Sequence, residues 1–318
     1  MQDSTIWTEK YRPTTFEQIV GQDKIVERSK AFVEQKNMPN LLFSGPPGVG
    51  KSTLALVIAR QLYGHSFREN FLELNSSDDR GIDVVRHTIK DFSRTKAIAN
   101  VPFKIIFLDE CDSLTKEAQH ALRRTMENYT NVTRFILSCN YSSKIIDPII
   151  SRCSVFRFKP IQKDDIKKII SEISKNEKLK ILDPAKEALV NVSSGDIRKL
   201  QNILQMISST TKDITDKVVY EVIGQATPKE IQESLILAVK GNFISAREKL
   251  LDTMLKYGLS GIDIIKQIQK EIWDLSIKEN QKIRLIDKCA EIEFRMVEGS
   301  DEFVQLEALL SNFIQDKS

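Results

Sequence analysis

The stretch that decides the fold is NLLFSGPPGVGKS, residues 40–52. Its first part, Asn40 to Ser44, has an apolar centre with polar ends, as a short buried β-strand does. The next part, Gly45 to Ser52, matches the phosphate-binding pattern G-x-x-x-x-G-K-[ST] without a mismatch. From Leu54 onward apolar residues recur every four positions, which predicts a helix. The stretch therefore predicts a strand, a phosphate-binding loop and a helix in succession.

Each part of this loop has a role in binding a nucleoside triphosphate. Its glycines let backbone N–H groups point at phosphate oxygens, and the N-terminus of the following helix adds the positive end of its dipole. We expect Lys51 to reach the β- and γ-phosphates of ATP and Ser52 to coordinate Mg²⁺. A chance glycine-rich turn is the weaker alternative, because the flanking strand and helix lie where the mechanism requires them. The predicted nucleotide-binding residues are Gly45, Pro46, Pro47, Gly48, Val49, Gly50, Lys51, Ser52 and Thr53.

The rest of the chain divides by its periodicity. Four more short apolar runs predict strands, at residues 71–74, 104–108, 134–139 and 155–158. Because helical patterns separate them, we expect an α/β fold with a five-stranded, mostly parallel sheet. Beyond Pro160 the strand patterns fade, and the helices are broken near residues 183, 195 and 227. We therefore predict three domains: a nucleotide-binding domain over 1–160, a small helical domain over 161–226 and an all-helical domain over 227–318.

Composition places the chain among folded globular proteins. At roughly 100–200 residues per domain, 318 residues fit two or three domains. The 47 basic and 44 acidic residues leave a net charge of +3, so any contact with nucleic acid needs a local patch. No segment approaches the ~18 apolar residues that cross a bilayer, and we expect neither export nor membrane insertion. The cysteines lie far apart, so we expect reduced thiols in a cytosolic compartment and no structural zinc: Cys111, Cys139, Cys153 and Cys289.

Two carboxylates end the apolar run that begins at Lys104. Asp109 is placed to hold the Mg²⁺ shell. Because successive strand residues point to opposite sides, Glu110 is free to polarise the water that attacks the γ-phosphate. A solvated acidic strand end is the alternative, which the phosphate-binding loop upstream makes the weaker one. The pattern therefore predicts ATP hydrolysis.

Three further polar residues are weaker candidates on pattern alone. Asn140 ends the next predicted strand and could orient water or sense the γ-phosphate, although a lone asparagine is more often a turn former. Arg152 and Arg198 are more often ordinary surface cations, and spacing alone would not select either of them.

Several segments of the chain resemble those of replication factor C small subunits, most closely the archaeal type, and they follow one another in the same order as in that family. The resemblance covers nearly the whole chain. It implies an AAA+ ATPase of the clamp-loader group, in which five subunits form an open spiral that loads a ring-shaped sliding clamp onto primer–template DNA. The segments are WTEKYRP (7–13), the phosphate-binding loop, LNSSDDRGI (74–82), LDECD (108–112), ALRRTME (121–127), SRC (151–153), GDIR (195–198), KGNF (240–243) and LEALL (306–310).

The resemblance also implies roles for single residues. Tyr11, Arg12 and Val20 would line the adenine pocket. Asn140 would be the first sensor, and Arg198, on a helical lid over 161–226, the second. Arg152 would be an arginine finger that acts in trans on the ATP of the neighbouring subunit. The domain over 227–318 would form an oligomerisation collar with a large subunit and further small subunits. The location would be cytoplasmic in an archaeal-type cell and nuclear in a eukaryote.

DNA contact is predicted for a helix after residue 82. Arg86 and Lys90 lie four positions apart and so share one face of it, with Arg80 just before it. In the family that the chain resembles, this helix lines the central channel and follows the DNA backbone. A solvated helix face is the alternative. Repeated around a spiral, these charges would give sequence-independent, salt-sensitive binding. By analogy, the clamp would contact residues 126–131.

Cys111 departs from the sequence pattern of this family. The family commonly has alanine where this chain has Cys111, a change that leaves both carboxylates in place.

A structural ring subunit that binds nucleotide without hydrolysing it is disfavoured, because Lys51, Asp109, Glu110 and Arg152 are all present. Another AAA+ machine, such as an origin-recognition or branch-migration ATPase, would need a C-terminal winged-helix domain. Residues 231–313 lack the β-hairpin pattern of such a domain.

Overall fold

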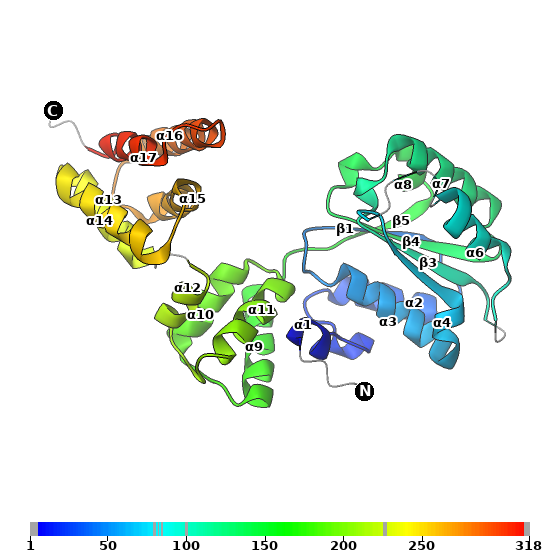
Figure 1. Ribbon diagram of the computed structural model, residues 1–318. Coiled ribbons are helices and arrows are strands. Elements are labelled where there is room, and N and C mark those ends of the chain that lie inside the picture. Colours follow the sequence, from blue (N-terminus) through cyan, green and yellow to red (C-terminus); the bar gives the residue numbers. More distant parts are fainter. Residues whose placement is uncertain are drawn as a thin grey trace. The chain divides into compact units, whose positions relative to one another are not determined.

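The computed structural model describes residues 6–78, 81, 83, 85–98, 101–224 and 228–314. The chain divides into two compact units. The first comprises Met1–Leu179 with Leu189–Gln205, and the second Lys180–Ala188 with Met206–Ser318. Figure 1 shows the sheet of the first unit and the helices of the second. The division into three domains stays a prediction from the sequence.

A five-stranded parallel sheet forms the centre of the first unit. Its strand order is β2-β3-β4-β1-β5, so the strand before the phosphate-binding loop lies between two others (Figure 1). The predicted α/β fold class is therefore confirmed. The sequence patterns placed each strand to within two residues of its observed ends: β1 (Asn40–Ser44), β2 (Phe71–Asn75), β3 (Lys104–Asp109), β4 (Thr133–Cys139) and β5 (Cys153–Arg157).

Helices cover both faces of this sheet, which is why its strands are apolar on both sides. Along β1, Leu41 and Phe43 pack into a core with α2 (Asp23–Glu34) and α3 (Lys51–Tyr63). Leu42, between them, points the other way and packs with α7 (Lys116–Asn128) and α8 (Asp147–Ile150). All three leucine and phenylalanine side chains are fully buried. Burial of such a side chain is worth roughly 1.5–3 kcal/mol, so the alternation along one strand fixes which helix lies on which face.

The remaining elements complete the first unit. A π-helical segment, η3, leads directly into α6, so the predicted helix after residue 82 is wound differently in its first part. In α9 the buried residues Ile166, Ile170 and Ile173 follow helical spacing. The bounds are α1 (Trp7–Lys10), η1 (Phe16–Gln18), η2 (Gly64–Ser66), α4 (Phe67–Asn70), η3 (Val85–Ile89), α6 (Lys90–Arg94), η4 (Cys111–Ser113), η5 (Ser142–Lys144), α9 (Lys163–Glu177), and α10 (Asp183–Ser193) and α11 (Ile197–Ser208), which cross between the units.

The second unit is built mainly from helices around one apolar core. Ile231, Leu235 and Leu306, which have helical spacing in the sequence, are buried in it. Two two-residue strands, β6 (Lys180–Ile181) and β7 (Asp213–Ile214), pair in parallel. Neither strand was predicted from the sequence, because a two-residue strand has no detectable period. The helices are α12 (Asp216–Val222), α13 (Pro228–Val239), α14 (Phe243–Tyr257), α15 (Gly261–Glu271), η6 (Ile272–Asp274), α16 (Glu279–Val297) and α17 (Glu302–Ser311).

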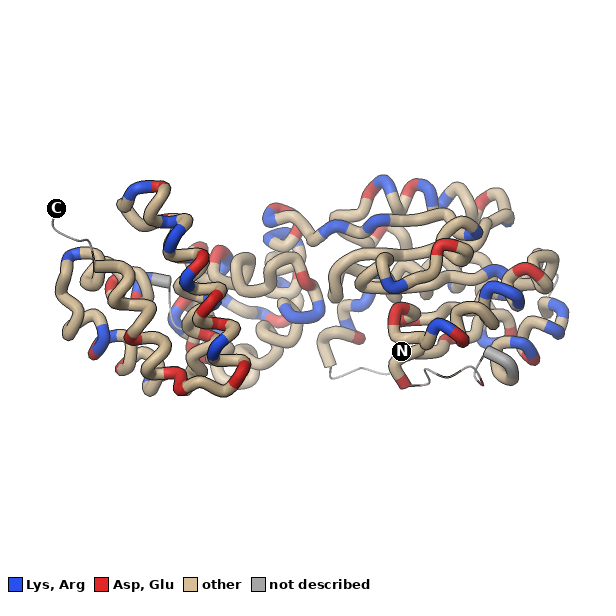
Figure 2. The backbone as a smooth tube through the Cα atoms, turned by 90° about the horizontal axis from the view of Figure 1, so that it is seen from above, with Lys and Arg blue, Asp and Glu red and all other residues tan. Residues whose placement is uncertain are grey.

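Charged residues are distributed over both units. Basic and acidic positions are interspersed along the backbone tube, in keeping with the small net charge (Figure 2). Within the described part of the chain, no helix is both long enough and apolar enough to cross a membrane.

Candidate functional site

The predicted phosphate-binding lysine is buried at the start of α3. Only 8% of Lys51 is exposed. Its Nζ donates to the carbonyl oxygens of Gly45 at 2.7 Å and Pro46 at 2.8 Å, and to Oδ1 of Asn140 at 2.9 Å. Burial lowers the pKa of Lys51, and the nearby Asp109 carboxylate opposes that shift. Two residues that were predicted on separate grounds, Lys51 and Asn140, are thus in direct contact.

Strand register explains this meeting. Ser44, the last residue of β1, pairs with Cys139 of β4, so the loop after β1 begins beside Asn140. Leu108 of β3 pairs with Leu137 of β4, which brings Asp109 to the same edge. Ligands of open parallel sheets bind at the carboxyl ends of the strands. Three strands that lie far apart along the chain, β1, β3 and β4, therefore bring their side chains together at one edge of the sheet.

The two predicted Mg²⁺ ligands lie within hydrogen-bond distance of each other. The Ser52 hydroxyl donates to Oδ2 of Asp109 at 2.6 Å, and Oδ1 of Asp109 accepts the Glu110 N–H at 2.9 Å. Carboxylate and hydroxyl oxygens are the hard ligands that Mg²⁺ takes, together with substrate phosphates and water. The donor set at this edge therefore fits one magnesium ion.

Glu110 adopts an uncommon backbone conformation. Its φ is +51°, in the left-handed region that side chains other than glycine rarely occupy. β3 ends at Asp109 and the turn of η4 begins at Cys111, so the chain bends at Glu110. Such a residue costs of order 1–3 kcal/mol and persists where the surroundings hold it. The turn separates the two carboxylates: Asp109 bonds to Ser52, while Glu110 is partly exposed at the cavity described next.

These residues line a cavity of about 880 Å³ in the first unit. Its size is within the range of small-molecule sites, roughly 300–1,000 Å³. Gly45 and Pro46 do not line it, and contribute instead the carbonyls that bind Lys51. The predicted site residues on its walls are Tyr11, Arg12, Val20, Pro47, Gly48, Val49, Gly50, Lys51, Ser52, Thr53, Asp109, Glu110, Asn140 and Arg198.

Hydrogen bonds join the N-terminal segment to α9 and α11, two helices that also line this cavity. The Tyr11 hydroxyl donates to Oε1 of Glu177 at 2.5 Å, and Lys10 Nζ donates to the same oxygen at 2.6 Å. Burial, followed by this hydrogen bond to a carboxylate, raises the pKa of Tyr11. The Trp7 N–H donates to Oε1 of Gln205 at 2.9 Å. The segment therefore holds α9 and α11 against the cavity.

Apart from Arg198, the wall that α9 and α11 supply was not predicted from the sequence. No motif marks these residues, because they line the cavity only through the packing of their helices. The amphipathic pattern of α9 predicts which face is apolar, but not what that face covers. The missed residues of this wall are Ile169, Glu172, Ile173, Asn176, Ile197 and Gln201.

Gly48 joins the phosphate-binding loop to the helix that carries Arg198. Its φ is +68°, and a Cβ at this position would lie 1.7 Å from Oδ1 of Asp196. Its carbonyl accepts the Ile197 N–H at 3.0 Å. Asp196 in turn caps α11, since its Oδ1 accepts the Lys199 N–H at 2.9 Å. Only glycine combines this backbone angle with so close an approach.

Gly48→Ala is accordingly expected to lower the free energy of unfolding by about 2 kcal/mol. About half comes from the left-handed backbone and half from the displaced cap of α11. Urea titration followed by circular dichroism measures it. Gly258→Ala is the control, because Gly258 also has left-handed backbone angles, φ +63° and ψ +37°, but no described atom lies within 4 Å of its missing Cβ. Equal losses in the two variants would contradict the role of the Asp196 contact.

Several predicted residues lie away from this cavity. Arg152 lines a separate cavity of about 420 Å³, with Phe32 and Arg134 among its neighbours. Lys90 is exposed on α6. Arg80 and the side chain of Arg86 lie outside the described residues. Met126, at the start of the segment predicted to touch the clamp, is only 1% exposed and packs in the core, so any contact there falls to residues 127–131.

Two family models match the chain. Residues 41–161 match the ATPase family associated with various cellular activities (AAA), and residues 226–312 match the replication factor C C-terminal domain. Similar curated proteins include the replication factor C small subunits of Archaeoglobus fulgidus, Methanococcus vannielii and Sulfolobus acidocaldarius. The first is 51% identical, over 98% of both chains. The second is 52% identical over 96% of this chain and 97% of its own length, and the third 52% over 98% and 96%.

A solved structure shares the fold at much lower identity. The Thermotoga maritima RuvB Holliday junction branch migration motor superposes with a TM-score of 0.56 at 17% identity. The match covers 71% of this chain and 79% of that one. It supports the AAA+ fold alone.

Proposed function

This chain belongs to the replication factor C small-subunit family, and we propose on that basis which of its residues carry the reaction and which partners it meets. It is a nucleotide-binding AAA+ ATPase of a clamp loader, acting in DNA replication. The nucleotide is ATP, bound with Mg²⁺ in the 880 Å³ cavity. The observation that carries the assignment is the contact of Lys51 with Asn140 and of Ser52 with Asp109 at one edge of the sheet.

Each of these residues has a separate task in hydrolysis. The loop N–H groups and the start of α3 bind the phosphates, and Lys51 contacts the γ-phosphate. Ser52 and Asp109 would hold the Mg²⁺, and a bound ion would neutralise charge on the triphosphate. Glu110 accepts the proton of the attacking water, and Asn140 orients that water. Arg198, at the start of α11 and also on the cavity wall, contacts the γ-phosphate.

The adenine base lies at the end of the cavity formed by the N-terminal segment. Tyr11, Arg12 and Val20 line the cavity, as does Ile173 of α9. The hydrogen bond from Tyr11 to Glu177 supports the proposal, because it holds the tyrosine ring against α9. Nucleotide binding would therefore connect the sheet with α9 and α11.

Arg152 is the arginine finger of a neighbouring site. Its guanidinium does not reach the nucleotide cavity of its own subunit, since it lines a different cavity. A finger that stabilises γ-phosphate charge must then act on the ATP of another subunit. This geometry supports an assembly in which one subunit completes the site of the next. We take the assembly to be a ring of five, in which small subunits lie beside one another and a large subunit.

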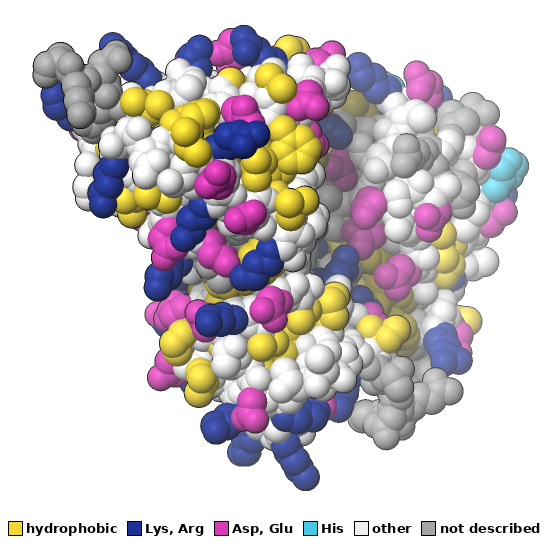
Figure 3. Space-filling view, turned by 60° about the vertical axis from the view of Figure 1, so that its left-hand side comes forward, with side chains coloured by type: hydrophobic (Ala, Val, Ile, Leu, Met, Phe, Trp, Pro, Cys, Tyr) yellow, Lys and Arg dark blue, Asp and Glu magenta, His cyan; other side chains and the backbone are white. Residues whose placement is uncertain are grey.

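The second unit supplies the collar of this ring. Its exposed side chains include large apolar ones, among them Leu255 at 76%, Ile244 at 68% and Phe294 at 66%. Apolar side chains gather among charged ones on the face that Figure 3 draws. Exposed apolar patches commonly mark protein interfaces.

The ring acts on a sliding clamp and on primer–template DNA. Residues 127–131, at the exposed end of α7, meet the clamp, and Arg80, Arg86 and Lys90 follow the DNA backbone. We place this activity at the chromosome, in the cytoplasm of an archaeal-type cell or the nucleus of a eukaryote. The RuvB likeness favours no branch-migration role, since every described element between residues 228 and 314 is helical, unlike a winged-helix domain.

ATP hydrolysis by the assembled ring tests this function. The turnover should rise when clamp and primed DNA are added together. Lys51→Ala should weaken ATP binding by about 10- to 100-fold, because it removes a charge-assisted hydrogen bond to phosphate worth about 1.5–3 kcal/mol. Lys116→Ala is the control, because Lys116 is exposed at the start of α7. Nucleotide binding without hydrolysis in the wild type would favour the structural ring subunit instead.

A further inference from the structure

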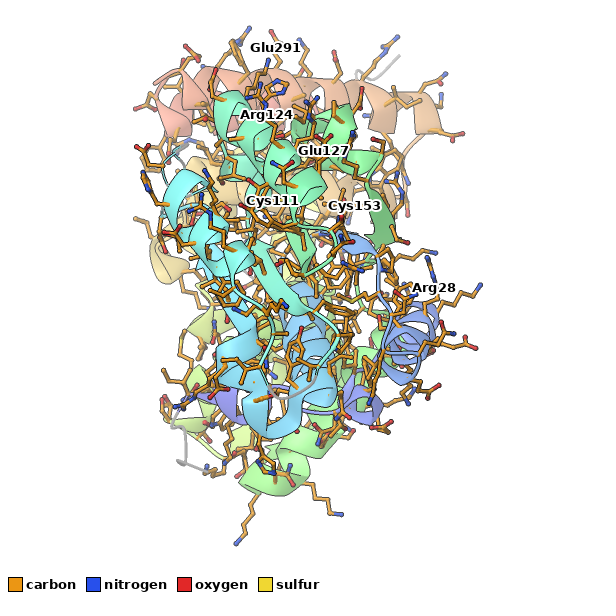
Figure 4. The ribbon with its side chains drawn as sticks, turned by 90° about the vertical axis from the view of Figure 1, so that its right-hand side faces the viewer. Arg28, Cys111, Arg124, Glu127, Cys153 and Glu291 are labelled. Carbon is orange, nitrogen blue, oxygen red and sulfur yellow. The ribbon has the colours of Figure 1, made fainter. Side chains whose placement is uncertain are left out.

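Arg152 is held by a carboxylate from another element of the same unit. Its Nη2 lies 2.6 Å from Oε1 of Glu127, at the C-terminal end of α7. Its Nη1 donates to the carbonyl of Pro148 in α8 at 2.7 Å. Figure 4 labels Glu127 on α7 and Cys153, the residue that follows Arg152 and begins β5. The guanidinium is thus bound on two sides, once by a backbone carbonyl and once by a charge.

A second guanidinium lies next to the same carboxylate oxygen. Arg123 is one helical turn before Glu127 in α7, and its Nε is 3.6 Å from Oε1 of Glu127. That Nε is buried, and no hydrogen-bond partner for it is found among the described residues. A buried donor of this kind gains from any acceptor that moves toward it. Glu127 therefore lies between two arginines and makes its short contact with only one of them.

This arrangement conflicts with the task of an arginine finger. A finger acts through its positive charge, and a carboxylate at 2.6 Å offsets that charge. An incoming γ-phosphate and the Glu127 carboxylate are both anions, so they compete for the same N–H group and repel each other. Arg152 therefore has to leave Glu127 before it can bind phosphate fully.

We propose that Glu127 is a positioning residue for Arg152. In a resting ring it holds the guanidinium back from the neighbouring ATP, and when the finger engages the γ-phosphate, Glu127 turns to the Nε of Arg123. The hydrogen bond to Pro148 keeps the base of the finger in place during this exchange. This inference rests on the proposed trans role of Arg152.

The effect of Glu127 should be moderate and confined to the resting state. Both partners are 38% exposed, and ion pairs of this exposure are weak. Glu127→Gln should raise the turnover of the assembled ring without clamp or DNA by about two- to fivefold. With clamp and DNA present the variant should show no such rise, because the finger is then already engaged, and any fall in that rate would report the clamp contact proposed for residues 127–131. Glu117→Gln removes the same charge from an exposed position of α7 and should alter neither rate.

A double-variant cycle separates positioning from a structural role. In an Arg152→Ala background, Glu127→Gln should have no effect on the resting rate, since no finger is left to hold. An effect that persists without Arg152, or a resting rate equal to wild type in Glu127→Gln alone, would overturn the proposal. If Arg152→Ala itself leaves hydrolysis unchanged, the proposed finger fails and this inference fails with it. If Arg152→Ala abolishes hydrolysis while Glu127→Gln matches wild type, only the inference fails.

Discussion

Replacement of Glu110 by glutamine is expected to lower ATP turnover by about 10²- to 10⁴-fold while ATP still binds. The amide has the size of the carboxylate, but it cannot take the proton of the attacking water. The residues that bind phosphate and Mg²⁺ do not depend on it, because Ser52 bonds to Asp109 and Lys51 to Asn140. Steady-state hydrolysis of the assembled ring, measured beside equilibrium binding of ATP, separates the two effects.

The backbone at Glu110 makes a control necessary. Its φ of +51° means that a substitution could also disturb the turn into η4. Glutamine tolerates this angle about as well as glutamate, so the unfolding temperature should not move. Glu69→Gln, at an exposed position of α4, should leave both binding and turnover unchanged. Full hydrolysis by Glu110→Gln would show that another group activates the water.

Arg152→Ala is expected to reduce turnover of the ring by roughly 10³- to 10⁵-fold, the range that arginine fingers supply. The affinity of the isolated chain for ATP should not change, because Arg152 does not line its own nucleotide cavity. Arg152→Lys should recover only part of the loss, since lysine keeps the charge but lacks the planar fork that binds phosphate through two N–H groups.

Mixing subunits tests whether this arginine acts in trans. A ring assembled from Glu110→Gln and Arg152→Ala chains contains interfaces at which an intact Glu110 faces an intact Arg152. Turnover in the mixed ring should therefore exceed that of either variant alone. A mixture as inactive as its components, or full activity in a strictly monomeric wild-type chain, would contradict a finger shared between subunits.

Much of the fold was predictable, because single segments of the sequence carry the pattern of the strand or helix that they form. β1 runs from Asn40 to Ser44, as its apolar run predicts, and α3 begins directly after the glycine-rich loop. The pair β6 and β7 was missed, because two residues cannot show a period of two. The helix after residue 82 was expected, but not the π-helical winding of residues 85–89.

The candidate site was predictable where a motif carries its own mechanism. Lys51, Ser52 and Asp109 follow from the loop pattern and from an acidic strand end, and all three line the cavity. Asn140 was a weaker candidate on pattern alone, and strand register makes it a partner of Lys51. The α9 wall, with Ile173 and Asn176, had no sequence signal because many amphipathic helices share the same pattern.

By itself, then, the sequence determined the local structures: a strand that must be buried on both faces, a loop whose glycines permit phosphate to approach, and helices with one apolar side. Only the tertiary structure decided which distant residues became neighbours, such as Glu127 with Arg152 and Tyr11 with Glu177. The physical reason is one of range. Backbone angles and side-chain periodicity act over a few residues, whereas strand register and helix packing join positions that no local pattern relates.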